Sequence, residues 1–252
     1  MKKRIYDEMN YGEIINLGRH RLLCGDATRY EDVIKLVGSD KINLVLTDPP
    51  YGIKCQDKKG AIAYKVNRGI KGAREEHYKN AKLSSHQYPL MIGDNSQETA
   101  KKFYNIAKEF SENFIIWGGQ YFAHFLPVSG GWIFWNKVTG SNDFSDGELA
   151  YCSRGKRIRM YTQMWNGTFR AGKQKYELKR RVHPTQKPVE LHMKILEDFS
   201  QPDDVILDCF GGSGTTLIAC EMTRRKCLMM EISPEYCEII RKRYEELRTC
   251  PQ

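Results

Sequence analysis

Short apolar runs alternate along the chain with amphipathic stretches. Six of these runs consist largely of apolar residues, as buried strands do, and several end in Gly or Asp. They span residues 20–26, 42–48, 113–119, 131–137, 204–210 and 226–232. Residues 100–110 and 191–199 carry apolar side chains at helical spacing, and a last helix is expected after Ser233, its N-cap, with Pro234 in the first turn. This alternation predicts an α/β fold with a mostly parallel sheet flanked by helices.

The composition indicates a single domain. With 252 residues, of which 40% are hydrophobic, the chain can bury a substantial core, so we expect one domain over residues 1–252. No stretch of about 18 apolar residues is present, and the first residues contain no apolar signal segment. The eight cysteines include no C-x-x-C pair and are expected to be reduced. These features predict a cytoplasmic protein without a membrane partner.

The positive charge is concentrated in two segments that look loop-like. Residues 154–181 contain ten Lys or Arg and one acid, and residues 54–82 contain nine basic and three acidic residues, whereas the whole chain has a net charge of +9. In the first segment the cations are interleaved with Tyr and Trp, a mixture suited to phosphate contacts and base stacking. The segments favour a polyanionic partner, although a merely solvated basic insertion remains an alternative.

The sequence TDPPYG, residues 47–52, directly follows an apolar run. Pro49 and Pro50 restrict the backbone, so Asp48 and Tyr51 are expected to be held in a fixed relation. The exocyclic amine of adenine is a poor nucleophile because its lone pair is delocalised into the ring. The Asp48 carboxylate and the Pro49 carbonyl could accept its two N–H bonds while Tyr51 stacks on the base. The alternative interpretation is a stiff turn that merely ends a strand.

Residues 204–220 have the pattern of a strand, a glycine-rich turn and a helix. Gly212 and Gly214 allow close backbone approach to a ligand, and the helix N-terminus offers free N–H donors. Glu231 follows Asp208 by 23 residues, near the offset at which an acid binds ribose hydroxyls in such folds. A dinucleotide fingerprint would need Gly or Ala where Leu217 stands, and a P-loop would need a Lys. The pattern indicates a nucleoside-containing cofactor.

Two further positions carry weaker signals. Asp26 ends a short apolar run and could equally be an N-cap or turn residue, and His183 begins the sequence HPTQKP before a predicted helix, where a simple helix-entry role is the alternative.

Taken together, the motifs resemble those of the nucleic-acid amino-methyltransferases, specifically the permuted beta group of DNA methyltransferases. In that family the D-P-P-Y motif precedes the target-recognition region, which precedes a cofactor motif of the F-x-G-x-G type. Here TDPPY, the basic segment, HPTQKP and FGGSGTT occur in that order over nearly the whole chain. The resemblance implies a Rossmann-like S-adenosylmethionine-dependent methyltransferase fold with a circularly permuted motif order.

The resemblance also implies roles for individual residues. Catalysis is assigned to Asp48, Pro49, Pro50 and Tyr51. The cofactor S-adenosylmethionine is expected to contact Asp26, Ala27, Asp48, Thr185, Lys187, Asp208, Phe210, Gly212, Ser213, Gly214, Thr215, Thr216 and Glu231. Of these, Glu231 is expected to hold the ribose, Asp26 the adenine amine, and Thr185 and Lys187 to lie beside the cofactor carboxylate. No ligand spacing for a metal is present among His and Cys.

Double-stranded DNA is the expected partner. Residues 138–182 are predicted to be an inserted target-recognition region, and residues 52–95 a mobile basic loop that orders over DNA. The predicted DNA contacts are Arg154, Lys156, Arg157, Arg159, Arg170, Lys173 and Lys175. Because a base inside a duplex cannot reach a buried methyl donor, base flipping is implied. A homodimer and a cognate restriction nuclease are further partners that the resemblance suggests.

Asp before Pro-Pro resembles the N6-adenine enzymes more than the N4-cytosine enzymes, so N6 of adenine is the predicted target. N4 of cytosine is the first alternative. An RNA or protein-amide methyltransferase could use a similar turn, and a catalytically inactive DNA-binding protein on the same fold is a further alternative.

Overall fold

The computed structural model describes residues 9–54, 92–139, 145–166, 169–170 and 182–249. Within them, nine strands form one sheet in the order β1-β2-β11-β10-β3-β4-β6-β5-β7. These strands are β1 (Ile14–Leu17), β2 (His20–Cys24), β3 (Leu44–Thr47), β4 (Phe114–Trp117), β5 (Gly131–Asn136), β6 (Gly147–Cys152), β7 (Ile158–Thr162), β10 (Val205–Asp208) and β11 (Lys226–Glu231). A separate pair consists of β8 (Trp165–Asn166) and β9 (Phe169–Arg170).

Most neighbouring strands of the sheet are parallel. The five strands from β2 to β4 in the sheet order are all parallel, and β5 is parallel to β7. Only β1 at one end and β6 between β4 and β5 run antiparallel to their neighbours. All the parallel strands therefore end at one edge, which we call the carboxyl edge. The predicted α/β fold with a mostly parallel sheet is confirmed.

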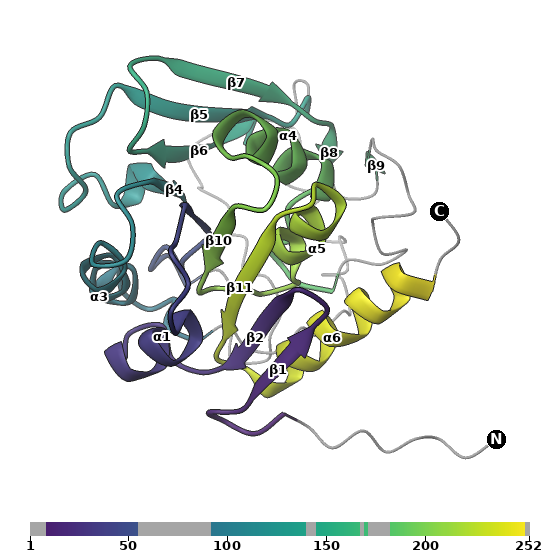
Figure 1. Ribbon diagram of the computed structural model, residues 1–252. Helices are drawn as coiled ribbons and strands as arrows, with labels where there is room; N and C mark the ends of the chain where they lie inside the picture. Colours follow the sequence, from purple (N-terminus) through teal and green to yellow (C-terminus); the bar gives the residue numbers. More distant parts are fainter. Residues whose placement is uncertain (1–8, 55–91, 140–144, 167–168, 171–181, 250–252) are drawn as a thin grey trace, which may run out of the picture.

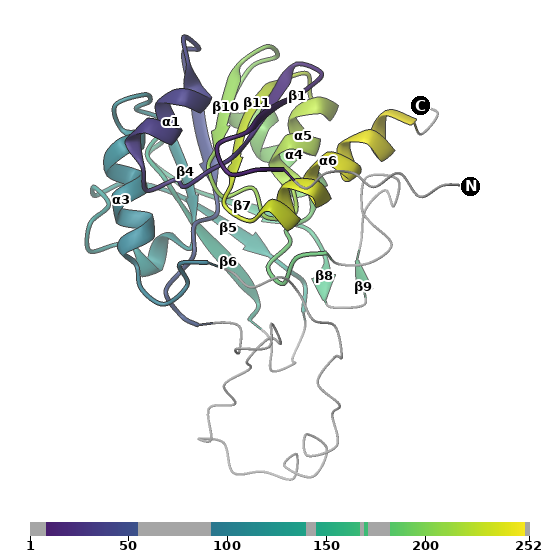
Figure 2. The same cartoon turned by 90° about the horizontal axis from the view of Figure 1, so that it is seen from below.

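Helices cover both faces of the sheet. Helices α1 (Tyr30–Val37) and α3 (Glu98–Ala107) lie on one face, and α4 (Val189–Phe199), α5 (Thr215–Met222) and α6 (Pro234–Thr249) lie on the other (Figures 1 and 2). A short 3-10 helix, η1 (Gly119–Tyr121), follows β4. The Ser233 hydroxyl accepts a hydrogen bond from the Tyr236 N–H at 3.4 Å, so Ser233 caps α6 as predicted.

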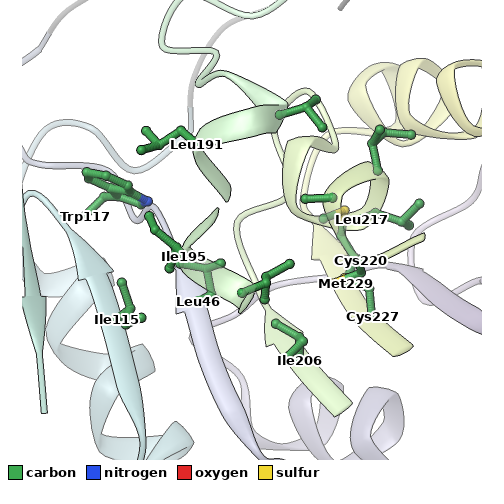
Figure 3. Packing of buried hydrophobic residues seen from close by; sticks show 14 of the residues in the cluster. Leu46, Ile115, Trp117, Leu191, Ile195, Ile206, Leu217, Cys220, Cys227 and Met229 are labelled. Carbon is green, nitrogen blue, oxygen red and sulfur yellow. The ribbon is translucent and has the colours of Figure 1, made fainter. Parts of the chain in front are cut away.

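The buried strands are apolar on both sides because helices cover both faces. Along β3, Leu44 and Leu46 belong to the core under α4 and α5, whereas Val45 belongs to the core under α1 and α3. Ile206 and Leu207 of β10 divide in the same way. Figure 3 shows the first of these cores, in which α4 and α5 pack on the central strands. Such strands read as continuous apolar runs, which explains why the sequence pattern located them.

Strands β6 and β7 show where the sequence pattern was insufficient. Residues 154–181 were expected to be loop-like, and this is wrong at β7, which is the edge strand next to β5 (Figure 1). Ile158 and Met160 of β7 are exposed, so the strand lacks the apolar run that marks a buried one. The predicted insert of residues 138–182 likewise contains β6, which is an integral strand of the sheet.

In the described part of the chain, no helix is both long and apolar enough to cross a bilayer. The described cysteines are free and buried, in agreement with the expected reduced state; they are Cys24, Cys152, Cys209, Cys220, Cys227 and Cys237.

Candidate active site

A cavity of about 470 Å³ opens at the carboxyl edge, between the ends of β2, β3, β10 and β11. It brings together nearly all the residues that the sequence assigned to catalysis and cofactor binding. The assigned residues that line it are Asp26, Ala27, Asp48, Pro49, Pro50, Tyr51, Thr185, Lys187, Asp208, Phe210, Gly212, Ser213, Thr215, Thr216 and Glu231. Gly214 does not line the cavity; a Cβ there would lie 3.1 Å from Ile240 of α6, so the position supports helix packing. The positive φ of Gly214, +79°, also favours glycine.

The catalytic turn is anchored at the end of β3. The Thr47 hydroxyl donates to Asp208 Oδ1 at 2.7 Å, which ties the end of β3 to the end of β10. Because both strands end at the carboxyl edge, Asp48 is directed into the cavity beside the glycine-rich turn. The predicted rigid relation of Asp48 and Tyr51 has a direct counterpart: the Tyr51 hydroxyl donates to Asp48 Oδ1 at 2.6 Å.

The Tyr51 ring sits against two aromatic residues and a glycine. It stacks on Tyr121 with 5.1 Å between ring centroids and meets the edge of Phe122. Gly118, at a φ of +71°, passes so close that a Cβ there would lie 2.2 Å from Tyr51 Cε1. Gly118 is therefore needed both for its backbone conformation and for the position of the tyrosine ring.

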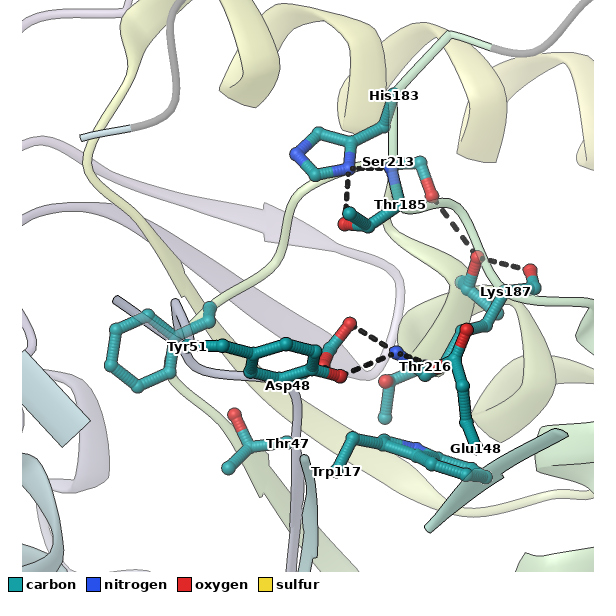
Figure 4. Close-up of polar contacts among 12 residues, drawn as sticks. Thr47, Asp48, Tyr51, Trp117, Glu148, His183, Thr185, Lys187, Ser213 and Thr216 are labelled. Carbon is teal, nitrogen blue, oxygen red and sulfur yellow. Dashed lines mark hydrogen bonds and ion pairs between the residues drawn. The ribbon is translucent and has the colours of Figure 1, made fainter. Parts of the chain in front are cut away.

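Asp48 lies at one end of a series of four side chains of alternating charge, of which Figure 4 labels Asp48, Lys187 and Glu148. The Lys187 ammonium donates to Asp48 Oδ2 and lies 3.3 Å from Glu148 Oε2. Glu148, at the start of β6, is in turn paired with Lys137, which follows β5. The Lys187 ammonium also lies 5.0 Å from the centre of the Trp117 ring. Four charged groups that come from separate parts of the chain thus meet at the catalytic turn.

The charges change one another's ionisation. Burial raises the pKa of Asp48 even though the nearby Lys187 ammonium lowers it. Burial alone would lower the pKa of Lys187, but the carboxylates of Asp48 and Glu148 outweigh that effect and raise it. Burial would raise the pKa of Glu148, and the ammonium groups of Lys187 and Lys137 outweigh it and lower the value. Lys187 therefore remains charged at neutral pH.

The carboxyl end of β11 supplies a second acceptor. Glu231 receives hydrogen bonds from the backbone N–H of Gly212 (2.7 Å) and of Ser233 (2.9 Å) and faces the cavity. Since the carboxylate faces the cavity and has about four acceptor positions, it can also accept a hydroxyl from a ribose. Gly212 has a φ of +50° and carries the backbone past the cavity without a side chain. A nucleoside-containing cofactor fits this combination of an acidic end, a glycine turn and a cavity of this size.

Asp26 is a turn residue that also faces the cavity. Its Oδ1 accepts hydrogen bonds from both the backbone N–H and the hydroxyl of Thr28, each at 2.8 Å. It is not the N-cap of α1, which is Arg29. The turn interpretation is thus confirmed, and the cavity-facing position keeps the expected contact with an adenine amine as a prediction.

The two ends of the HPTQKP segment, residues 183–188, make different contacts. The Thr185 hydroxyl and backbone N–H contact His183 Nδ1, at 3.1 and 3.3 Å, and the His183 ring meets Tyr236 edge-on. The ammonium of Lys187, in contrast, contacts the catalytic turn. Thr185 remains available for the expected position beside a cofactor carboxylate, whereas Lys187 faces Asp48 and Glu148.

Several residues of the site carry no sequence signal. Lys137 and Glu148 are separated from every motif, and Trp117 and His192 belong to apolar or helical stretches. Trp117 Nε1 donates to His192 Nε2 at 3.2 Å. Burial, together with the charge of Lys187, lowers the pKa of His192 to about 3, so this imidazole is neutral. Lys137, Glu148 and His192 line the cavity, and the pairing of β6 with β4 places Glu148 beside the catalytic turn.

The predicted DNA contacts whose side chains the structure describes lie on β7 and on the connection between β6 and β7. Because β6 runs antiparallel to β4, Arg154, Lys156 and Arg157 follow its end at the edge opposite Asp48. The five residues of β7 alone separate the two edges by about 16 Å. Arg159 lies within β7, 3.5 Å from Asp198.

The connection that carries Arg154, Lys156 and Arg157 thus lies at the edge of the sheet away from the catalytic turn, so any contact of these residues with DNA would be made away from Asp48. Arg170 lies in β9, where only the backbone is described, and Lys173 and Lys175 lie outside the described residues, as does residue range 55–91 of the predicted basic loop.

Known proteins share these features. Residues 42–242 match the N6/N4 DNA methylase family. The type II methyltransferase M2.MboI of Moraxella bovis is 45% identical over 65 residues, which are 26% of this chain and 24% of that relative. The type II methyltransferase M.HpaI of Haemophilus parainfluenzae is 23% identical over 89% of this chain and 74% of its own length. This chain thus spans about a quarter of the first relative and about three quarters of the second.

Solved structures share the fold. The PvuII DNA methyltransferase, which is cytosine-N4-specific, superposes with a TM-score of 0.58 at 16% identity, covering 95% of this chain and 94% of that one. The TTHA0409 protein of Thermus thermophilus, complexed with S-adenosyl-L-methionine, gives a TM-score of 0.50 at 19% identity, covering 92% and 96%. The family match extends over most of the chain and includes both the turn at Asp48 and the glycine turn at Gly212, and this chain therefore belongs to the N6/N4 family of DNA methylases.

Proposed function

We propose that this protein transfers a methyl group from S-adenosylmethionine to N6 of adenine in DNA. The observation that carries the proposal is the shared cavity at the carboxyl edge, into which the Asp48–Tyr51 turn and the Glu231 and Gly212 pair both face. One half of the cavity has the acceptors that an exocyclic amine needs, and the other half has the acid and backbone that a nucleoside needs.

S-adenosylmethionine is the cofactor of this family. Glu231 would hold its ribose hydroxyls, Asp26 its adenine amine, and Thr185 with the N-terminus of α5 its carboxylate. When bound, the cofactor supplies a methyl group on a positively charged sulfur, and the carbon–sulfur bond breaks as the nitrogen–carbon bond forms. No residue of the protein needs to form a covalent bond with the methyl group.

The residues of the turn act on the amine. Asp48 and the Pro49 carbonyl accept its two N–H bonds, which favours a pyramidal nitrogen with a localised lone pair. The Tyr51 ring, fixed by Tyr121 and Gly118, offers a surface on which the base can stack. After transfer the nitrogen gives up one proton, which the Asp48 carboxylate can accept. The product is the methylated base.

The base must leave the duplex to enter this cavity, so base flipping is part of the proposal. Two basic ranges of the sequence, 55–91 and 171–181, supply charge for DNA binding in this proposal, and the described residues Ile53, Ile92 and His183 near their ends line the cavity. A homodimer and a cognate restriction nuclease are further proposed partners, in keeping with the restriction-modification names of the relatives.

N4 of cytosine is the second candidate target, since the PvuII enzyme with a similar fold is cytosine-N4-specific. Asp as the residue before Pro-Pro favours adenine. The deciding experiment is methylation of unmethylated DNA with labelled S-adenosylmethionine, followed by digestion to nucleosides. We expect the label in N6-methyldeoxyadenosine. Label in N4-methyldeoxycytidine would overturn the choice of base, and label only in RNA or protein would overturn DNA as the substrate.

A further inference from the structure

Lys187 is a buried cation between two acids. Its side chain is 4% exposed, and its ammonium contacts Asp48 Oδ2 and lies 3.3 Å from Glu148 Oε2. Glu148 is paired on its other oxygen with Lys137. The Tyr51 hydroxyl, which completes the cluster, lies 3.4 Å from the Lys187 ammonium. The four charged side chains come from three strand ends and from the segment before α4, so the cluster exists only in the folded protein.

Stability gives no reason for this arrangement. Burying a charged group away from water costs free energy of folding. Replacing a buried ion pair with apolar side chains of similar volume often leaves the stability of a protein unchanged or raises it. A buried chain of charges that ends on the residue proposed to accept the substrate amine is instead typical of a functional site.

We propose that Lys187 is a positioning residue for methyl transfer, which fixes Asp48 through Oδ2 and keeps it in the ionised form that accepts an N–H bond. The inference rests on the proposed function. It differs from the expected contact of Lys187 with a cofactor carboxylate, because the ammonium is already held by the two acids.

The geometry leaves Asp48 able to act. Tyr51 occupies one lone pair of Oδ1 and Lys187 one lone pair of Oδ2, so each oxygen retains a second position for the amine. The two bonds, one to each oxygen, also fix the orientation of the carboxylate. The charged groups that interact with it are Lys187, Glu148 from β6 and Asp208 from β10, with Lys137 paired to Glu148 on its far side. Among these, Lys187 is the cation that touches Asp48.

The test compares Lys187→Gln and Glu148→Gln with the wild-type protein, measuring kcat for labelled methyl transfer to DNA across the acidic pH range and the Kd for S-adenosylmethionine. For Lys187→Gln we expect kcat to fall roughly 100-fold, as for a misplaced catalytic group. The acidic limb of its kcat–pH profile should move to higher pH, because the cation that favours ionised Asp48 is absent from the variant. The Kd for S-adenosylmethionine should stay unchanged. For Glu148→Gln the limb should move to lower pH, because a neighbouring negative charge is removed.

Opposite movements of the two limbs cannot come from general structural damage, and Lys187→Arg, which keeps the charge, should restore the wild-type limb. An unchanged limb in Lys187→Gln overturns the inference, and a weakened Kd with an unchanged limb assigns Lys187 to the cofactor instead. These outcomes leave the proposed function standing, because wild-type transfer to DNA is measured in the same series. Absence of that wild-type transfer contradicts the proposed function and this inference with it.

Discussion

At the scale of single residues, the site depends on a few side chains with constrained surroundings. Asp48 and Tyr51 are recognisable in the sequence because two prolines separate them. The constraint on them is not recognisable, since it comes from residues far along the chain, such as Gly118, Lys187 and Asp208. Local chemistry can thus be read from a motif, whereas its support depends on the tertiary arrangement.

Gly118 provides a steric test of the tyrosine position. In Gly118→Ala the new Cβ would collide with the Tyr51 ring, so we expect methyl transfer to fall roughly 100-fold with S-adenosylmethionine binding retained. Gly12→Ala is the matched control: Gly12 also has a positive φ, +83°, but its Cβ would meet only the Lys35 amine at 3.9 Å. Equal kinetic losses in both variants would show that backbone strain, not the ring, causes the effect.

Asp208 gives a pH-dependent prediction for stability. Burial raises the pKa of Asp208 to about 7, far above its value in an unfolded chain, so the folded protein holds this proton more tightly. The stability gained from the bound proton is therefore lost as pH rises from about 4 to 7. Asn stays neutral and can still accept the bonds from Thr47 and Phe210.

In thermal unfolding without cofactor, Asp208→Asn should therefore have the higher Tm at pH 8, by several degrees, and a smaller advantage at pH 5. A Tm difference that does not change with pH would contradict the assigned burial effect.

At the scale of elements, the sequence predicted the strands that are buried on both faces and the helices that have one apolar face. Strands such as β3 and β10 are covered on both faces, so their apolar runs stand out, and helices α3, α4 and α6 show an apolar stripe. Strands β1, β6 and β7 and helix α1 were not predicted. Partly exposed or polar positions, as in β7, give no continuous run, and pairing between distant segments is not recorded in local periodicity.

The two kinds of strand should respond differently to truncation. Ile206→Ala in β10, where the side chain is fully buried, removes packing under α5, so it should lower the free energy of unfolding by about 2–5 kcal/mol. Ile158→Ala in β7, where the side chain is 68% exposed, should change it by less than about 0.5 kcal/mol. Chemical denaturation measures both values. A comparable loss in the two variants would mean that β7 is covered in solution.

At the scale of the whole molecule, topology decides which charges can reach the substrate. The motif order and overall charge suggested one basic recognition region, but the antiparallel β6 carries residues 154–157 to the edge opposite the cavity. Charge counting along a chain has no information about strand direction, and this is why the sequence could not show that residues 154–157 lie away from Asp48. The fold class and the cavity lining, in contrast, followed from motifs at strand ends.

The salt dependence of DNA affinity compares residues 154–157 with the other predicted DNA contacts, Arg170, Lys173 and Lys175. The triple variant Arg170→Gln, Lys173→Gln, Lys175→Gln should lower the slope of log K for DNA against log salt by roughly 2 to 3, because each phosphate contact contributes about 0.9. Arg154→Gln, Lys156→Gln, Arg157→Gln makes the same charge change at the edge of the sheet opposite Asp48, so the slope should stay close to that of the wild type. The reverse ranking would place DNA on the edge away from Asp48.

The central claim is that the Asp48 turn performs methyl transfer to a DNA base in the cavity shared with the cofactor. The most direct measurement is single-turnover transfer from labelled S-adenosylmethionine to DNA by the wild-type protein and by Asp48→Ala, with the cofactor Kd of each determined in parallel. The account predicts labelled N6-methyladenine with the wild type and a loss of at least about 100-fold in the variant at an unchanged Kd. Transfer that survives the loss of Asp48 would contradict it.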